Sequence, residues 1–260
     1  MSTATEAPRQ IHTRAPAHVH RSGREGRKST EIGPLLAICG LAGGAGATTL
    51  AYLVALAAAR QLNRPVLLAD TGGPSGDLAA LAGVEAPRSL PELASHLATG
   101  LPLTSGIYAT GPAGLLVLAT APQFQSSSNL AQLSRILDDA REAHQLTVID
   151  CGTLGRDADR AAAAAASHLA WVMPATEDGA SRGERVLQAA PSTAAKELLV
   201  ARRDVGQSKA RLQQLRRIAA ERRAALVLVP YVSALEHGAA DRALDEAQVA
   251  IQAILGASLR

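Results

Sequence analysis

The chain has 260 residues, of which 47% are hydrophobic and only 2% aromatic, and its formal net charge is +3. This length suits one large α/β domain or two small ones, and the apolar content suits an aliphatic core. The scarcity of aromatic side chains argues against a protein that binds single-stranded nucleic acid by base stacking. Residues 1–32 hold six basic and three acidic side chains, so the remaining chain is electrically neutral.

The first 32 residues are rich in Pro, Ser, Thr, Gly, His and Arg and show no apolar period. We therefore expect a disordered basic tail over 1–32, and not a signal peptide, because no apolar core is present. Residues 33–260 are expected to form a single domain. The two cysteines, Cys39 and Cys151, each end a predicted buried strand, which is typical of core residues in a reduced, cytoplasmic protein.

Residues 32–59 carry no charge and are long enough to raise the question of a membrane span. Glycines and threonines divide this stretch into a strand (34–38) and a helix (50–60), which argues against a span. Further apolar strands are predicted at 65–69, 114–119, 146–149, 169–173, 197–201 and 225–229. Helices are predicted at 90–97, 129–144, 157–167, 181–189, 207–222 and 240–255, and 100–111 is the least structured loop. Apolar strands alternating with helices predict an α/β fold, a three-layer α/β/α arrangement with a mostly parallel sheet.

The segment between the first strand and the first helix, Cys39–Thr49, reads CGLAGGAGATT. Strand, glycine loop and helix in this order are typical of a phosphate-binding loop, because backbone N–H groups and the helix N-terminus can then approach an anion. The candidate phosphate-binding residues are Gly43, Gly44, Gly46, Thr48 and Thr49. The loop's usual lysine is replaced by Ala47, and the chain's lysines are Lys28, Lys196 and Lys209. A tight packing turn without a ligand is the alternative interpretation.

Two acids end predicted strands: Asp70 follows 66–69, and Asp150 follows 146–149. Because parallel strands end at the same edge of a sheet, both carboxylates are expected near the glycine loop. Together with the Thr48 hydroxyl they form a candidate Mg²⁺ site, if a nucleotide binds. The alternative for each acid alone is a helix cap or a turn.

The same glycines fit a second nucleotide fold. Gly40, Gly43 and Gly46, followed by Asp70 at the end of the second strand, have the spacing of a dinucleotide-binding module. A short-chain reductase would need a Tyr-x-x-x-Lys pair, which none of Tyr52, Tyr108 and Tyr231 provides. This alternative is therefore a non-catalytic NAD(P)-binding module.

The glycine loop, Val66–Asp70 and Val148–Asp150 together resemble the ParA/MinD family of deviant Walker ATPases. Within that family, the chain resembles the CpaE/TadZ branch more closely, and this branch is associated with pilus assembly. Its second motif resembles Asp70–Asp77 (DTGGPSGD) followed by Arg88–Leu93 (RSLPEL), its third strand resembles Gly114–Ala119, and Arg182 also matches. The resemblance covers residues 34 to about 190 and implies a P-loop NTPase-like fold.

The departures from this family concern its catalytic residues. Ala42 stands at the signature lysine, Ala47 at the phosphate lysine, and Gly72 at the aspartate that positions the attacking water. Losing a phosphate-clamping cation or a water-positioning group can each cost several kcal/mol of transition-state stabilisation. The loop is therefore a degenerate Walker A motif, and we expect no catalytic residue and no efficient ATP hydrolysis.

The resemblance implies a pseudo-ATPase that acts as a localisation or assembly factor for a pilus, secretion or other envelope machine. Its ligand would be ATP or ADP with Mg²⁺, or no nucleotide at all. Its partners would be proteins of that machine and a second copy in a homodimer, and it would be cytoplasmic, with recruitment to a membrane or pole by those partners. An active ParA-type ATPase in chromosome or plasmid partition is the main alternative.

Two helical segments could contact other surfaces. Residues 202–223 hold eight basic and two acidic side chains, which suits either nonspecific DNA contact or, as we favour, a solvated amphipathic helix. The C-terminal helix carries acids opposite its apolar face, whereas a membrane-binding helix would carry lysines. We therefore expect it to dock on the core.

Overall fold

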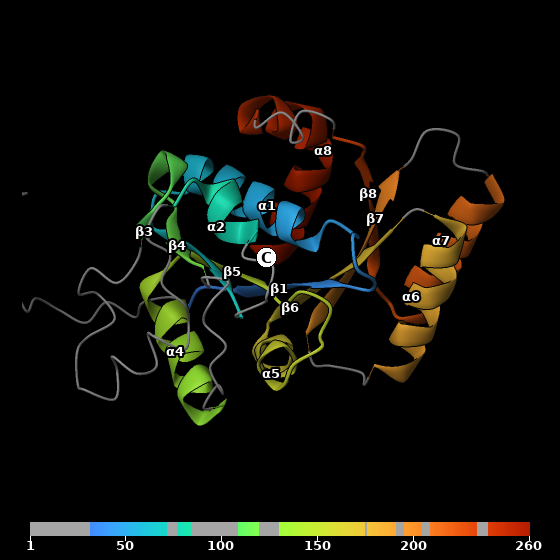
Figure 1. Cartoon of the computed structure of the whole chain (residues 1–260), viewed down its shortest axis with the longest axis horizontal. Coiled ribbons are helices and arrows are strands. Elements are labelled where there is room, and N and C mark those ends of the chain that lie inside the picture. The colour runs from blue at the N-terminus through green and yellow to red at the C-terminus, as the bar shows by residue number, and fades with distance from the viewer. Residues whose placement is uncertain are drawn as a thin grey trace, which may run out of the picture. The chain divides into compact units, whose positions relative to one another are not determined.

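The computed structural model describes residues 32–71, 77–84, 109–119, 130–174, 176–190, 195–203, 209–232 and 239–260. These residues form an eight-stranded sheet of order β3-β4-β2-β5-β1-β6-β7-β8 (Figure 1). All neighbouring strands are parallel except β3, which pairs antiparallel with β4 at one edge. The strands are β1 (Leu35–Gly40), β2 (Val66–Asp70), β3 (Ala109–Thr110), β4 (Leu116–Leu118), β5 (Leu146–Asp150), β6 (His168–Met173), β7 (Lys196–Arg203) and β8 (Ala225–Pro230).

Helices cover both faces of this sheet. The first face carries α1 (Ala47–Gln61), α2 (Asp77–Ala82) and α8 (Ala240–Ser258), and the second carries α4 (Leu130–Ala143), α5 (Asp157–Ala165), α6 (Glu177–Ala189) and α7 (Lys209–Glu221). Each face has its own apolar core, built mainly from Ala, Leu, Val and Ile. The predicted three-layer α/β/α arrangement with a mostly parallel sheet is therefore confirmed.

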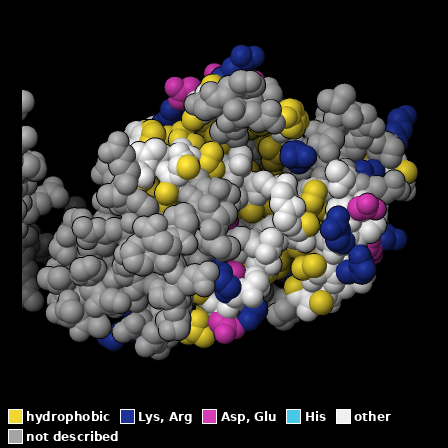
Figure 2. All heavy atoms as spheres, in the orientation of Figure 1, with side chains coloured by type: hydrophobic (Ala, Val, Ile, Leu, Met, Phe, Trp, Pro, Cys, Tyr) yellow, Lys and Arg dark blue, Asp and Glu magenta, His cyan; other side chains and the backbone are white. Residues whose placement is uncertain are grey.

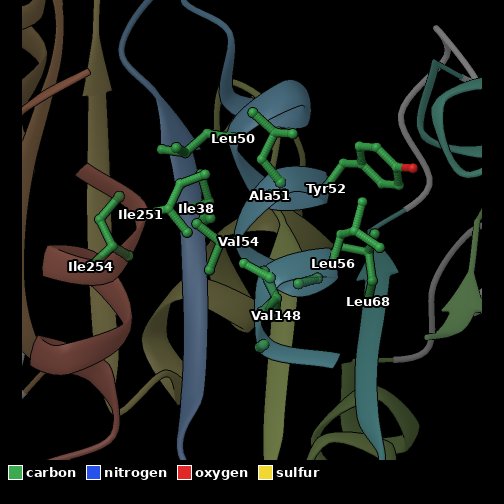
Figure 3. Close-up of a cluster of buried hydrophobic side chains, with 14 of the residues drawn as sticks. Ile38, Leu50, Ala51, Tyr52, Val54, Leu56, Leu68, Val148, Ile251 and Ile254 are labelled. Carbon is green, nitrogen blue, oxygen red and sulfur yellow. The ribbon is translucent and has the colours of Figure 1, made fainter. Parts of the chain in front are cut away.

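The uncharged stretch that includes β1 and α1 is explained by burial on every side. All six residues of β1 are buried, and α1 is enclosed by β1, β2 and β5 below it and by α2 and α8 beside it. Figure 3 shows Leu50, Val54 and Leu56 of α1 among Ile38, Val148 and Ile251. Among the residues that the structure describes, no helix is long and apolar enough to cross a membrane.

The C-terminal helix docks on the core, as predicted. Leu244, Ala247, Ile251 and Ile254 of α8 are buried against α1 and β8. Cys39 and Cys151 are fully buried free thiols, which confirms their interpretation as core residues.

We expect Gly256→Ala to stabilise the protein by roughly 0.5–1 kcal/mol. Gly256 lies within α8, and a Cβ added there would meet no atom within 4 Å. Alanine therefore improves helix propensity without a steric cost. The reciprocal control is Ala253→Gly at an exposed position of the same helix, which we expect to cost about 1 kcal/mol. Urea denaturation measures both changes, and a loss of stability for Gly256→Ala would contradict the expectation.

Several boundaries differ from the sequence-based expectations. The segment 100–111, expected as a loop, contains the short strand β3, and α2 was not predicted. The basic segment 202–223 is not one helix, because Arg202 and Arg203 extend β7 through pairing with β8, and α7 begins only at Lys209. The predicted helix at 90–97 and residues 1–31 of the predicted tail lie outside the described residues.

Candidate nucleotide site

The glycine loop connects β1 to α1 and has the backbone conformation that its glycines allow. Gly44 and Gly46 have φ values of 72° and 87°, in the left-handed region that side chains disfavour. A Cβ added at Gly43, Gly44 or Gly46 would meet no atom within 4 Å, so open space lies against the backbone there. No side chain caps the N-terminus of α1. Its first N–H groups and the positive end of its dipole are therefore suited to an anion.

Neighbouring segments hold the start of this loop in place. The Gly40 N–H donates to the Gly152 carbonyl at 2.6 Å, and the Leu41 N–H donates to the Val172 carbonyl at 2.9 Å. Gly183 of α6 approaches so closely that an added Cβ would lie 3.3 Å from the Leu41 side chain. The loop is thus anchored between the ends of β5 and β6.

The two predicted metal-binding acids lie side by side. Asp70 and Asp150 are partners in the register of β2 and β5, and each is only 6% exposed. The Thr48 hydroxyl is close enough to the Asp150 carboxylate to lower its pKa, and the Gly152 N–H donates to the same carboxylate at 3.0 Å. Thr48, Asp70 and Asp150 therefore form one group of hard oxygen ligands, which fits Mg²⁺ when phosphates and waters complete its coordination.

Burial raises the pKa of Asp150 above its ordinary value, and the charges of Asp70 and Asp159 raise it further. The hydrogen bonds from Thr48 and Gly152 oppose this shift but do not cancel it. In the absence of a cation, the ionised Asp150 carboxylate is therefore a source of instability, which is common where a site is built to bind a ligand.

We expect Asp150→Asn to raise the unfolding free energy at pH 7 by roughly 0.5–2 kcal/mol while abolishing Mg²⁺-dependent nucleotide binding. Because the folded-state pKa of Asp150 is raised, ionisation costs stability above that pKa, and the cost disappears as the pH falls through it. The gain should therefore shrink on acidification. Urea denaturation between pH 4 and pH 7 tests this, and a gain that does not depend on pH would contradict the assigned cause.

The two positions that the sequence resemblance assigns to lysines hold small apolar side chains. Ala42 is partly buried in the loop, and Ala47, the first residue of α1, is 8% exposed. Gly72 lies outside the described residues. Arg182, a candidate replacement cation, is exposed on α6, where its Nε donates to the Asp178 carbonyl of the same helix. In the described residues, Arg182 is therefore directed toward its own helix.

A polar cluster beside the acids was not found in the sequence. The Asp159 carboxylate, which is buried, accepts hydrogen bonds from the Thr71 hydroxyl and from the Arg156 Nη2, the latter at 2.6 Å. Arg156 Nη2 also donates to the Thr71 hydroxyl at 3.2 Å. These contacts join the segment after Asp150 to the segment after Asp70. The one sequence signal that could have pointed here is the acid at the third position of α5, whose carboxylate accepts the Arg156 N–H at the helix start, at 2.9 Å.

A cavity of about 190 Å³ opens beside the loop. Its walls come from Gly46, from Thr49 and other residues of the first turns of α1, and from the ends of β6, β7 and β8. Most of the lining is apolar, with Arg202 as its charged side chain; the Arg202 guanidinium lies 5.7 Å from the centre of the Tyr231 ring. An apolar slot next to an anion-binding loop suits a flat heterocyclic base attached to phosphates.

Two basic side chains of the segment 209–223, one on α7 and one in the turn after it, are engaged within the protein. Arg217 pairs with Glu184 at 3.0 Å, and Arg222 pairs with Glu197 at 2.6 Å. Figure 2 shows acidic side chains among the Lys and Arg side chains on the side where α6 and α7 lie. This intermixing supports the solvated-helix interpretation over DNA contact, because nonspecific DNA binding depends on an uninterrupted basic surface.

Comparisons with known proteins identify the fold. No protein-family model and no curated protein matches the sequence. Solved structures do match. A ParA family ATPase from Chlorobium tepidum has a TM-score of 0.71 and 14% identity, over 85% of this chain and 96% of its own. MinD from Pyrococcus horikoshii, complexed with Mg-ADP, has a TM-score of 0.65 and 18% identity, over 88% and 94%.

The MinC:MinD complex of Aquifex aeolicus also matches, with a TM-score of 0.65, 17% identity, and coverage of 86% of this chain and 96% of that one. These similarities extend over nearly the whole length of each solved chain, although sequence identity is low. The chain therefore has the α/β fold of the ParA/MinD ATPases.

Proposed function

We propose that this protein is a ParA/MinD-like nucleotide-binding scaffold that has lost ATP hydrolysis. The observation that carries the proposal is the loop itself. Its open glycine backbone and the Thr48–Asp150–Asp70 group are retained, while Ala42 and Ala47 provide no cation. Backbone N–H groups and Mg²⁺ can hold phosphates, but transition-state charge would lack its lysines.

The proposed ligand is ATP or ADP with Mg²⁺, bound more weakly than in an intact phosphate-binding loop. The apolar cavity beside Gly46 and Thr49 supports a base-binding role, since it adjoins the phosphate position. The Mg-ADP complex of the Pyrococcus MinD structure supports the same ligand class for this fold. In this role Gly43, Gly44, Gly46, Thr48 and Thr49 would contact phosphate, and Thr48, Asp70 and Asp150 would hold the metal.

The proposed role is that of a localisation or assembly factor for a pilus, secretion or other envelope machine, in line with the resemblance to the CpaE/TadZ branch. The Aquifex complex of MinD with MinC supports a protein partner for this fold. Recruitment to a membrane or pole would then depend on such partners, and a homodimer would present two copies of the site. Light scattering with and without Mg-ATP tests the dimer.

The strand order favours the phosphate-loop interpretation over the NAD(P) alternative. In a dinucleotide-binding fold the second strand pairs directly with the first, which brings its terminal acid to the ribose. Here β5 lies between β1 and β2, so Asp150 is next to β1, and Asp70 is one strand further away. This order supports a metal-binding role for Asp70 over a ribose-binding role.

A thermal-shift panel with ATP, ADP and NAD⁺, each with and without Mg²⁺, tests the proposal together with a turnover assay at high protein concentration. We expect ATP and ADP to stabilise the protein only with Mg²⁺, no effect of NAD⁺, and no turnover. Thr48→Val, which keeps the shape of the side chain, should remove the Mg²⁺ dependence. Turnover that is lost on Asp150→Ala would instead favour an active ATPase, and stabilisation by NAD⁺ alone would favour the dinucleotide module.

A further inference from the structure

A second and larger cavity lies at the N-terminal ends of the parallel strands, whereas the glycine loop lies at their C-terminal ends. Its volume is about 480 Å³, and it is lined by the first residues of β6, β7 and β8, by the turn after α7, and by Ala257 near the end of α8. Both cavities have walls from β6 and β7, and on β6 their lining residues His168 and Val172 are four positions, or about 13 Å, apart. The cavity is large enough for a small organic ligand.

The side chains that line this cavity include more basic groups than acidic ones, and only one of the basic groups is paired with a described acid. Lys196, Arg222 and Arg223 line it together with one acid, Glu197. Arg222 is fixed to Glu197 by two short hydrogen bonds, of 2.6 and 2.7 Å. Lys196 and Arg223 are exposed, and neither forms an ion pair with a described acid. The cavity therefore carries two positive charges that no described carboxylate neutralises.

The cavity wall also includes a histidine with an unsatisfied nitrogen. His168 is only 6% exposed, and its Nε2 has no hydrogen-bond partner among the described residues. Its Nδ1 lies 3.0 Å from the Ser167 hydroxyl, which already donates its own proton to the Leu35 carbonyl. When the Ser167 proton points to the Leu35 carbonyl, Nδ1 carries the imidazole proton and Nε2 is the acceptor; turning the Ser167 hydroxyl toward Nδ1 exchanges the two roles.

A buried acceptor without a partner costs about 1–3 kcal/mol, so a ligand that supplied a donor there would recover part of this cost. Burial and the charge of Lys196 both lower the pKa of His168, which keeps the ring neutral near pH 7. The neutral ring can accept a hydrogen bond from a hydroxyl group, and it does not add a third positive charge to the cavity.

We propose that this cavity binds a small dianion, either an organic acid or inorganic phosphate. Lys196 and Arg223 would bind its charges, and His168 Nε2 would accept a hydrogen bond from a hydroxyl group of the ligand. The affinity would come mainly from charge, and the Arg222–Glu197 ion pair would keep that side of the cavity fixed in position. The site does not depend on the nucleotide site: Thr48→Val should leave anion binding unchanged, so each proposal can fail without the other.

Isothermal titration of the full chain with malate, succinate and sodium phosphate, at ionic strength held constant with NaCl, tests the site. We expect saturable one-to-one binding, and at least tenfold weaker binding for the double variant Lys196→Gln/Arg223→Gln. Both side chains are exposed, so the variant should fold normally. The matched control is Lys209→Gln/Arg216→Gln, which removes two exposed charges of α7 that do not line this cavity.

The outcomes separate the parts of the proposal. Binding of phosphate but not of the dicarboxylates would assign phosphate, and the reverse would assign an organic acid. Malate should bind more tightly than succinate because of its hydroxyl, and His168→Phe should remove that difference; equal affinities would overturn the role of His168. The site itself is overturned if none of the three anions binds saturably, or if the double variant and its control bind equally well.

Discussion

Replacing Glu197 with alanine is expected to lower the unfolding free energy by about 3 kcal/mol or more, because a guanidinium inside the protein would lose its counter-charge. The side chains of Arg222 and Glu197 are only 17% and 7% exposed. Arg222 also donates to the Leu187 carbonyl at 2.8 Å and lies over the Trp171 ring. These contacts hold the guanidinium against the wall of the cavity that it lines, away from full solvation.

The matched control for this change is Glu246→Ala. Glu246 pairs with Arg242 on the surface of α8, where the arginine side chain is 78% exposed, and such a pair contributes about 0.3–0.5 kcal/mol. The double variant Glu197→Met/Arg222→Leu should recover most of the lost stability, since apolar residues often replace a buried ion pair without cost. Urea denaturation of all three proteins is the measurement. A loss below 1 kcal/mol for Glu197→Ala would show that the Arg222 side chain becomes solvated.

The sheet could be predicted because its strands are buried on both faces and therefore read as continuous apolar runs. The strand expected at 146–149, for example, appears as β5 over Leu146–Asp150. The failures occurred where an element depends on its neighbours. Apolar character ends at Ala201, yet β7 continues to Arg203 because Arg202 and Arg203 pair with Val229 and Pro230 of β8. That pairing cannot be read from residues 202–208 alone.

Helix starts show the same limit on a smaller scale. The apolar pattern suggested that a helix begins near Ser181, but α6 begins at Glu177. The reason is local: the Thr176 side chain accepts the Gly179 N–H at 3.2 Å and caps the helix. A search for capping residues, rather than for apolar periodicity, would have placed this start correctly.

The candidate site, like the fold, could be predicted from the sequence only in part. Asp70 and Asp150 were expected together because each ends a strand, and the register of β2 and β5 places them opposite one another. The Thr71–Arg156 contact joins residues 85 positions apart, and the Arg202–Tyr231 contact joins two strand ends. No spacing rule connects such pairs. Sequence reasoning thus located the backbone and the acids of the site but not the side chains that link its loops.

Introducing a lysine at the proposed phosphate loop by Ala47→Lys should tighten Mg-ATP binding by roughly 10- to 100-fold, or about 1.4–2.8 kcal/mol. Ala47 is the first residue of α1, next to the open backbone of Gly43, Gly44 and Gly46. An ammonium group there would add a charge to a site that otherwise offers phosphates only N–H groups and a metal. Affinity is measured by titration, because a lysine at this buried position will also lower the melting temperature of the free protein.

The matched control is Ala47→Met, which adds a side chain of similar length without charge. If the loop holds phosphates, the lysine variant binds Mg-ATP more tightly than the methionine variant. This difference in affinity should disappear with adenosine, which has no phosphates. Equal affinity of the two variants would mean that the loop does not hold phosphates, and would leave the fold as a platform without a nucleotide. Turnover should stay absent in Ala47→Lys if, as proposed, Ala42 and Gly72 stand where the family has its two other catalytic groups. Tighter binding without turnover would therefore support the proposal that the loop holds phosphates while the groups for hydrolysis are missing.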